Sequence, residues 1–114
     1  MKRFLALYIG SASPAEKVAA TINDDTRARG MAAWGNWMTK HATEIVDGGG
    51  PLGTTKKVSS AGVSDIQNSI TGYVIVQAES HAAAARMFEG HPHFAVFPGD
   101  SVEIMECLSI PGAS

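Results

Sequence analysis

Three segments of this 114-residue chain are apolar on both of the faces that an extended backbone presents. They are Phe4 to Ile9, Tyr73 to Ala78 and Val102 to Cys107. Because successive side chains of a strand point to opposite sides, strands of this kind must be covered from both sides. The sequence therefore predicts a sheet whose strands are buried on two faces.

Two helices are expected between these strands. The helical spacing of apolar residues such as Trp34 and Met38 predicts a helix from about Thr26 to Ala42, and acidic residues at its start complement the helix dipole. Ser80 is a typical N-cap for a second helix, which is expected to end at Gly90. Residues 54–59 are polar and β-branched and include two lysines, which is typical of an exposed edge strand.

The predicted order is strand, helix, strand, strand, helix, strand, which is the split βαβ pattern of α+β, ferredoxin-like domains with an antiparallel sheet. Two helices cover only one face of a four-stranded sheet, so the other face needs a different cover. A second copy of the chain is the simplest one. We therefore expect a homodimer in which two sheets meet face to face.

Composition limits the other partners. A net charge of -2 and a pI near 6.0 provide no basic surface for nucleic acid. The apolar run from Phe4 to Ile9 is too short for a membrane span and is expected to be a first strand rather than a signal peptide. The single cysteine, Cys107, is expected to be a small buried thiol, which fits a reduced cytoplasmic location without membrane contact.

Three segments carry a resemblance to a known family. Gly49–Leu52, Ile70–Val76 and Gly90–Phe94, the last followed by a turn and an apolar strand, resemble the YCII-related family. These are small ferredoxin-like proteins that pair into dimeric α+β barrels. The likeness runs over nearly the whole chain and implies one domain at residues 1–108 with a short tail at 109–114. It implies a fold more firmly than it implies a reaction.

His91 and His93 flank Pro92 in the loop before the last strand, and three interpretations are open. The pair could supply two metal ligands, but no third ligand with suitable spacing appears, so we expect no metal. One imidazole could instead cap backbone groups of a turn shaped by Pro92. Alternatively, His91 could face a cavity as a general acid or base, with His93 beside a substrate.

The resemblance implies a histidine and an aspartate acting as a proton-transfer pair. Asp47 is the better aspartate because it precedes the glycines that match the family pattern, whereas Asp100 lies in a turn where aspartate is common for local reasons. His91 is the histidine we favour. His41, at the end of the first helix, is an alternative, although it could serve only to complement the helix dipole.

Further residues are candidates for substrate binding. Trp34 and Trp37 belong to an aromatic and thioether stripe that is more often core than pocket wall, and Trp37 lies slightly off the stripe, which makes it the better pocket candidate. Lys56 could pair with a substrate carboxylate, or could simply guard an edge strand. The glycines at 48–50 precede Pro51 rather than a phosphate-binding motif, so no cofactor is expected.

Two functions follow from these residues. The first is an acid/base enzyme of the isomerisation or elimination type that acts on a small carboxylated or aromatic-derived compound. The second is a non-catalytic dimeric module that holds a small ligand in its cleft. A histidine with a shifted pKa beside a buried aspartate would favour the enzyme. Residues that do not converge would favour the binding module.

Overall fold

The computed structural model describes residues 1–10 and 23–111. The helices and strands follow the order expected for a split βαβ domain, with one extra hairpin and one extra helical turn. The elements are β1 (Lys2–Ile9), α2 (Asp24–Lys40), β2 (Ile45–Pro51), β3 (Thr55–Ser59), β4 (Gly62–Ile66), β5 (Ile70–Ala78), α3 (His81–Arg86), α4 (Pro92–Ala95) and β6 (Ser101–Glu106).

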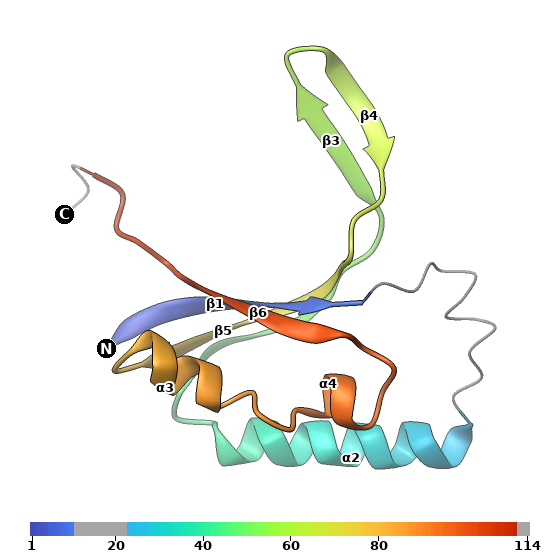
Figure 1. The fold of residues 1–114 in the computed structure, drawn as a ribbon, viewed down its shortest axis with the longest axis vertical. Helices are drawn as coiled ribbons and strands as arrows, with labels where there is room; N and C mark the ends of the chain where they lie inside the picture. The colour runs from blue at the N-terminus through green and yellow to red at the C-terminus, as the bar shows by residue number, and fades with distance from the viewer. Residues whose placement is uncertain (11–22, 112–114) are drawn as a thin grey trace.

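The main sheet has four strands in the order β2-β5-β1-β6, and every neighbouring pair is antiparallel. The helices α2, α3 and α4 all lie on one face of this sheet (Figure 1). This arrangement confirms the predicted α+β, ferredoxin-like fold. None of the helices in the described residues is both long and apolar enough to cross a membrane.

The core lies between the sheet and the helices. Side chains of β1 and β5 alternate between the two faces, and those facing the helices are buried. Phe4 and Val76 are fully buried and face each other across the β1–β5 ladder. The core residues are Phe4, Ala6, Tyr8, Trp37, Val74, Val76, Ala78, Ala84 and Phe88.

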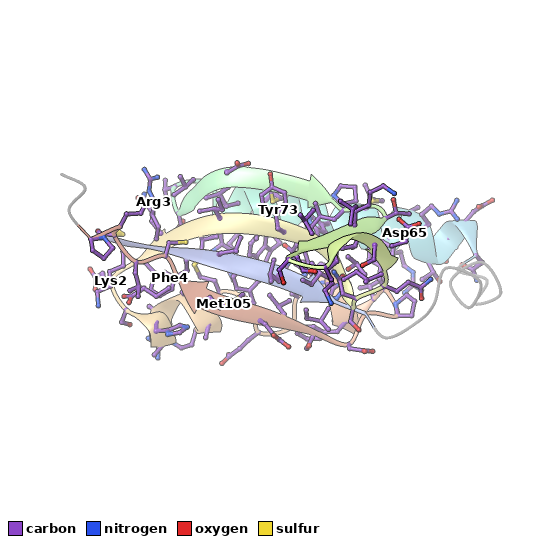
Figure 2. The ribbon with its side chains drawn as sticks, turned by 90° about the horizontal axis from the view of Figure 1, so that it is seen from above. Lys2, Arg3, Phe4, Asp65, Tyr73 and Met105 are labelled. Atoms are coloured by element: carbon purple, nitrogen blue, oxygen red, sulfur yellow. The ribbon has the colours of Figure 1, made fainter. Side chains whose placement is uncertain are left out.

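The opposite face of the sheet carries no helix (Figure 1). Its middle is mostly apolar, although Glu103 lies on it opposite Leu7. Leu5 lies in register between Ile75 on β5 and Met105 on β6, and Leu7 lies opposite Tyr73. Figure 2 looks down on this face, with Tyr73 and Met105 labelled. We call the side chains of Leu5, Leu7, Tyr73, Ile75 and Met105 the open face. The sequence-based expectation of strands apolar on two sides is therefore confirmed for β1 and β5. It is wrong for β6, where Glu103 lies on the open face and Glu106 on the other.

The edge strand expected at residues 54–59 is not part of the main sheet. This segment is β3, which pairs only with β4 in a two-stranded hairpin in the described structure. The hairpin rises from the sheet on the side of the open face (Figure 1). The edge position belongs to β2, whose glycines and proline are poor strand formers, so β2 depends on its pairing with β5.

Two smaller expectations are also corrected. The first helix begins earlier than predicted, because the side chain of Asn23 accepts a hydrogen bond from the Thr26 amide and caps it. Cys107 is exposed rather than buried, because it lies just past the end of β6, beyond the cover of the helices. The Ser80 cap of the second helix is confirmed by its bond from the Ala83 amide, but this helix ends at Arg86 rather than at the expected Gly90.

Gly49 provides a sharp test of the β2 geometry. Its φ of 65° lies in the left-handed region, and a Cβ there would overlap the carbonyl oxygen of Tyr73. Gly49→Ala should lower the free energy of unfolding by about 2 kcal/mol or more. Gly50→Ala is the matched control, because a Cβ at Gly50 meets nothing within 4 Å. Urea denaturation measures both, and equal stability of the two variants would contradict this account of β2.

Candidate functional site

His91 lies directly before α4, under the sheet on the helix side, and its side chain is fully buried. Its Nδ1 accepts a hydrogen bond of 3.0 Å from the backbone amide of His93. Since a backbone amide can only donate, the neutral ring carries its proton on Nε2. That nitrogen is 3.4 Å from the hydroxyl oxygen of Tyr8. The interpretation of one histidine as a backbone cap is therefore confirmed for His91.

Aromatic rings surround this imidazole. Its ring centroid is 4.6 Å from that of Trp34, 4.7 Å from that of Trp37 and 5.7 Å from that of Phe88. Burial, and then the positive charges of His93 and His41, lower the pKa of His91 from its usual 6.5 to about 4. Burial also raises the pKa of Tyr8. At neutral pH both groups are therefore uncharged.

His93 is also largely buried, and it anchors the loop to β1. Its Nε2 donates to the carbonyl oxygen of Ile9 over 2.8 Å, because a carbonyl can only accept. The ring packs 5.2 Å from that of Tyr8, centroid to centroid. Gly99 packs closely against the same imidazole, and a Cβ at that position would overlap it. His93 thus holds the loop and the end of β1 together.

Trp37 is a core residue in this structure. Only 7% of its surface is exposed, and its indole N–H donates to the carbonyl of Met87 over 2.7 Å. The need of a buried indole for a hydrogen-bond partner is thus met. Trp34 is half-buried and packs 5.0 Å from the Tyr8 ring. Of the two tryptophans, Trp34 is the one that packs on both His91 and His93 and is also partly exposed to solvent.

Asp47 does not join His91 in one chain. It is exposed on the edge strand β2, and its carboxylate accepts a bond of 2.9 Å from the amide of Gly49. Asp47 is opposite Ile75 in the ladder, and directly opposed residues of an antiparallel pair share a face. Ile75 belongs to the open face, whereas His91 lies on the helix side. The expected His91–Asp47 pair is therefore not formed within one chain.

Lys56 does not lie beside His91 and His93. It lies on the β3–β4 hairpin, where its ammonium group is 2.7 Å from the carboxylate of Asp65. Both side chains are well exposed, which matches the expectation of a solvated guard on a strand. Within the described residues, no three His, Cys, Asp or Glu side chains gather as a metal site would require.

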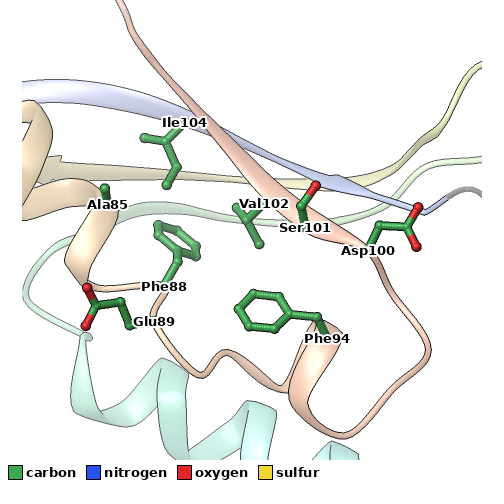
Figure 3. A pocket seen from close by; sticks show the side chains of 8 residues that line it. All are labelled: Ala85, Phe88, Glu89, Phe94, Asp100, Ser101, Val102 and Ile104. Atoms are coloured by element: carbon green, nitrogen blue, oxygen red, sulfur yellow. The ribbon is translucent and has the colours of Figure 1, made fainter.

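An open groove of about 340 Å³ lies between β6 and the chain from α3 to α4. Figure 3 shows its lining: Phe88 and Phe94 stand between the two elements, with Glu89 toward one end and Asp100 toward the other. The lining residues are Ala85, Phe88, Glu89, Phe94, Asp100, Ser101, Val102 and Ile104. Phe88 also stacks on His91, so this ring lies between the groove and the buried imidazole.

Sequence reasoning missed three residues of this region. The sequence around Tyr8 predicts a strand but no chemical role, although alternation with Phe4 and Ala6 places Tyr8 on the same face as them. Phe88 was assigned only to the second helix, and Phe94 only to the loop motif that suggested the family. An aromatic residue on a short loop is a weak signal, and 39% exposure of Phe94 appears only in the folded chain.

Comparisons with known proteins bear on the fold. No protein-family model matches the sequence, and no curated protein matches it. A solved structure of 5-chloro-2-hydroxyhydroquinone dehydrochlorinase, TftG, from Burkholderia phenoliruptrix in complex with 2,5-dihydroxybenzoquinone is similar, with a TM-score of 0.54. The match has 17% identity and covers 90% of this chain and 89% of that one. It supports the YCII-like ferredoxin-type fold expected from the resemblance.

Proposed function

We propose that the chain is a dimeric module that binds a small ring-bearing compound in the groove beside β6. The observation that carries this proposal is a groove of about 340 Å³ that holds the exposed ring of Phe94, with the buried core ring of Phe88 at its wall. That volume lies at the lower end of the range for small-molecule sites. The similar dehydrochlorinase structure holds a six-membered ring compound, which supports the same class of ligand here.

The separation of His91 from Asp47 favours binding over catalysis. Proton transfer by His91 needs a free ring nitrogen or a route for its proton, yet Nδ1 is occupied by the His93 amide and Nε2 faces Tyr8. In a face-to-face pair of sheets, Asp47 would lie between the sheets while His91 stays below one of them. The dimer would therefore not bring the two together.

The binding experiment uses 1,4-benzenedimethanol, an uncharged ring compound, followed by ligand-observed NMR. We expect saturable binding that Phe94→Ala weakens about five-fold or more, because the ring of Phe94 is lost from the groove. Phe94 is 39% exposed, so this substitution should leave the fold intact. Met31→Ala, on the exposed side of α2, is the matched control. Equal binding by the Phe94 and Met31 variants would rule out the groove.

A second candidate is the acid/base enzyme of the elimination or isomerisation type. The observation that favours it is a buried histidine with a lowered pKa beside a phenol, since perturbed titrating groups often mark catalytic sites. In an elimination a base removes a proton and the leaving group departs with its electron pair, whereas in an isomerisation the proton is returned to another atom of the same molecule. Chloride release from a chlorinated hydroxyhydroquinone, measured with purified protein, decides this. Release above the buffer rate would favour the enzyme over the binding module.

The homodimer belongs to the same proposal. The open face brings together five large side chains in the middle of a sheet, all of them partly exposed in a single chain. Apolar patches of this kind on a sheet are usually covered by another layer. A second copy of the chain, related by a two-fold axis, buries both open faces in a self-complementary contact.

A further inference from the structure

We propose that the β3–β4 hairpin is an arm that packs against residues 107–110 of a second copy of the chain. We call residues 107–110 the end segment. This inference rests on the homodimer of the proposed function, and it names the parts of the two chains that meet outside the open faces. It concerns how two copies hold each other rather than whether they pair.

The hairpin carries an exposed apolar pair. Val58 and Val63 are directly opposite each other in the β3–β4 ladder, so their side chains lie together on one face of the hairpin. They are 77% and 68% exposed. In the described structure the hairpin forms a sheet of its own, and a two-stranded hairpin without further packing is at best marginally stable in water. The valine face therefore needs a contact that its own chain does not supply.

The end segment carries a second exposed apolar pair. Leu108 and Ile110 are 78% and 75% exposed. These two residues, the valine pair and Met1 are the five most exposed large apolar side chains of the described residues. The hairpin and the end segment both rise on the side of the open face (Figure 1). Two protruding parts of the chain thus place their apolar side chains beside the surface that we assign to the dimer.

The two parts stand at opposite ends of the sheet. The hairpin follows Pro51, which pairs with Gly72, and Gly72 in turn pairs with Tyr8. The end segment starts where the Cys107 amide donates to the carbonyl of Arg3. Five residues of extended β1, roughly 16 Å, separate Arg3 from Tyr8. In Figure 2, Asp65 of the hairpin and Arg3 accordingly lie toward opposite ends. A hairpin therefore does not reach its own end segment.

A second copy with its ends exchanged brings the two parts together. If the two-fold axis of the face-to-face pair lies across the strands, the Tyr8 end of each sheet covers the Arg3 end of the other. Each hairpin then meets the end segment of the other copy, and this contact occurs twice. A stable interface uses roughly 20–30 residues of each partner, more than the open face alone supplies. An axis along the strands would instead set the two hairpins at the same end.

The charges of the open face agree with exchanged ends. Arg3 lies on this face two residues before Leu5, and Glu103 lies on it opposite Leu7. Neither is in an ion pair within the described residues. With the axis across the strands near Leu5, Arg3 of one copy lies over Leu7 of the other, one strand from Glu103. Opposite charges then approach each other, whereas an axis along the strands would bring the two Arg3 ends together.

A double-mutant cycle tests the arm, with the dimer dissociation constant measured by analytical ultracentrifugation. Val58→Thr with Val63→Thr keeps the β-branched shape that suits a strand and makes the hairpin face more polar. Leu108→Ser with Ile110→Ser does the same for the end segment. Each pair of changes should weaken the dimer about 30-fold or more, because polar groups enter a contact that occurs twice. All four changes together should weaken it no more than about three-fold further, since both pairs remove the same contact.

Lys57→Thr is the matched control. Lys57 is opposite Ser64, on the other face of the hairpin, so its replacement should leave the dissociation constant unchanged. An unchanged constant in either apolar pair, or effects of the two pairs that multiply in the four-residue variant, would overturn the arm while the dimer stands. A wild-type protein that stays monomeric would overturn the dimer and the arm together. Circular dichroism of each variant checks that the fold is kept.

Discussion

Replacing Leu5 by lysine should convert a particle of twice the 11.9 kDa chain mass into a single chain. Leu5 lies in the middle of the open face, between Ile75 and Met105. In a dimer of sheets, an ammonium group at this position is taken out of water among mostly apolar side chains. We expect the dimer to weaken by at least about 100-fold, which is about 3 kcal/mol.

The isolated chain should tolerate the same substitution. The open face is in contact with water in a single chain, so the lysine remains solvated there, and the helix-side core is unchanged. Light scattering after size exclusion at micromolar concentration measures the mass, and circular dichroism checks the fold. Met31→Lys places the same charge on the exposed surface of α2 and should leave the dimer intact. A wild-type protein that is monomeric at this concentration would refute the face-to-face arrangement.

The alternation of apolar residues predicted the strands of the main sheet, because the burial of apolar side chains determines which way each residue of a strand faces. Phe4, Ala6 and Tyr8 face the helices, and Leu5 and Leu7 form part of the open face, as a period of two requires. The strand β2 was harder to predict. Its sequence, Ile45–Pro51, contains three glycines and a proline, which have low strand propensity. Its existence depends on pairing with β5, a contact between distant segments that local sequence does not reveal.

The site was less predictable than the sheet for a similar reason. The β2–β5 ladder shifts register between Ile45 and Asp47 and again between Asp47 and Gly50. Each shift of one residue moves a side chain to the other face of a sheet. The face of Asp47 therefore depends on irregularities that its sequence does not specify. His91 and Tyr8 are separated by 83 positions, and only the folded chain shows that they meet.

The second large effect expected is on stability, through His91. His91→Ala should lower the free energy of unfolding at pH 8 by about 3 kcal/mol. The substitution removes a fully buried ring that packs on Trp34, Trp37 and Phe88, and it leaves the His93 amide without its acceptor. His81→Ala is the matched control. The His81 side chain is exposed, makes one hydrogen bond, to Ile104, and touches the Phe4 ring only from the exposed side, so its loss should cost about 1 kcal/mol.

The same histidine should make stability depend on pH. Burial lowers the pKa of His91 from 6.5 to about 4, so the unfolded chain binds a proton near pH 6.5 while the folded chain resists protonation until about pH 4. Its contribution is therefore complete above pH 6.5 and is lost as the pH falls toward 4, by up to about 3 kcal/mol. Urea denaturation at pH 8, 6 and 4.5 should show this loss in the wild type and in His81→Ala.

His91→Ala should lack that part of the pH dependence, although it is less stable throughout. His91→Gln provides a second variant with a larger side chain, for use if the alanine variant does not fold, and it too should lose the His91 part of the slope. If the variants without an imidazole at position 91 lose stability between pH 8 and 4.5 as steeply as the wild type, then a different group resists protonation in the folded chain. In that case the neutral, Nε2-protonated His91 facing Tyr8 would not describe the protein in solution.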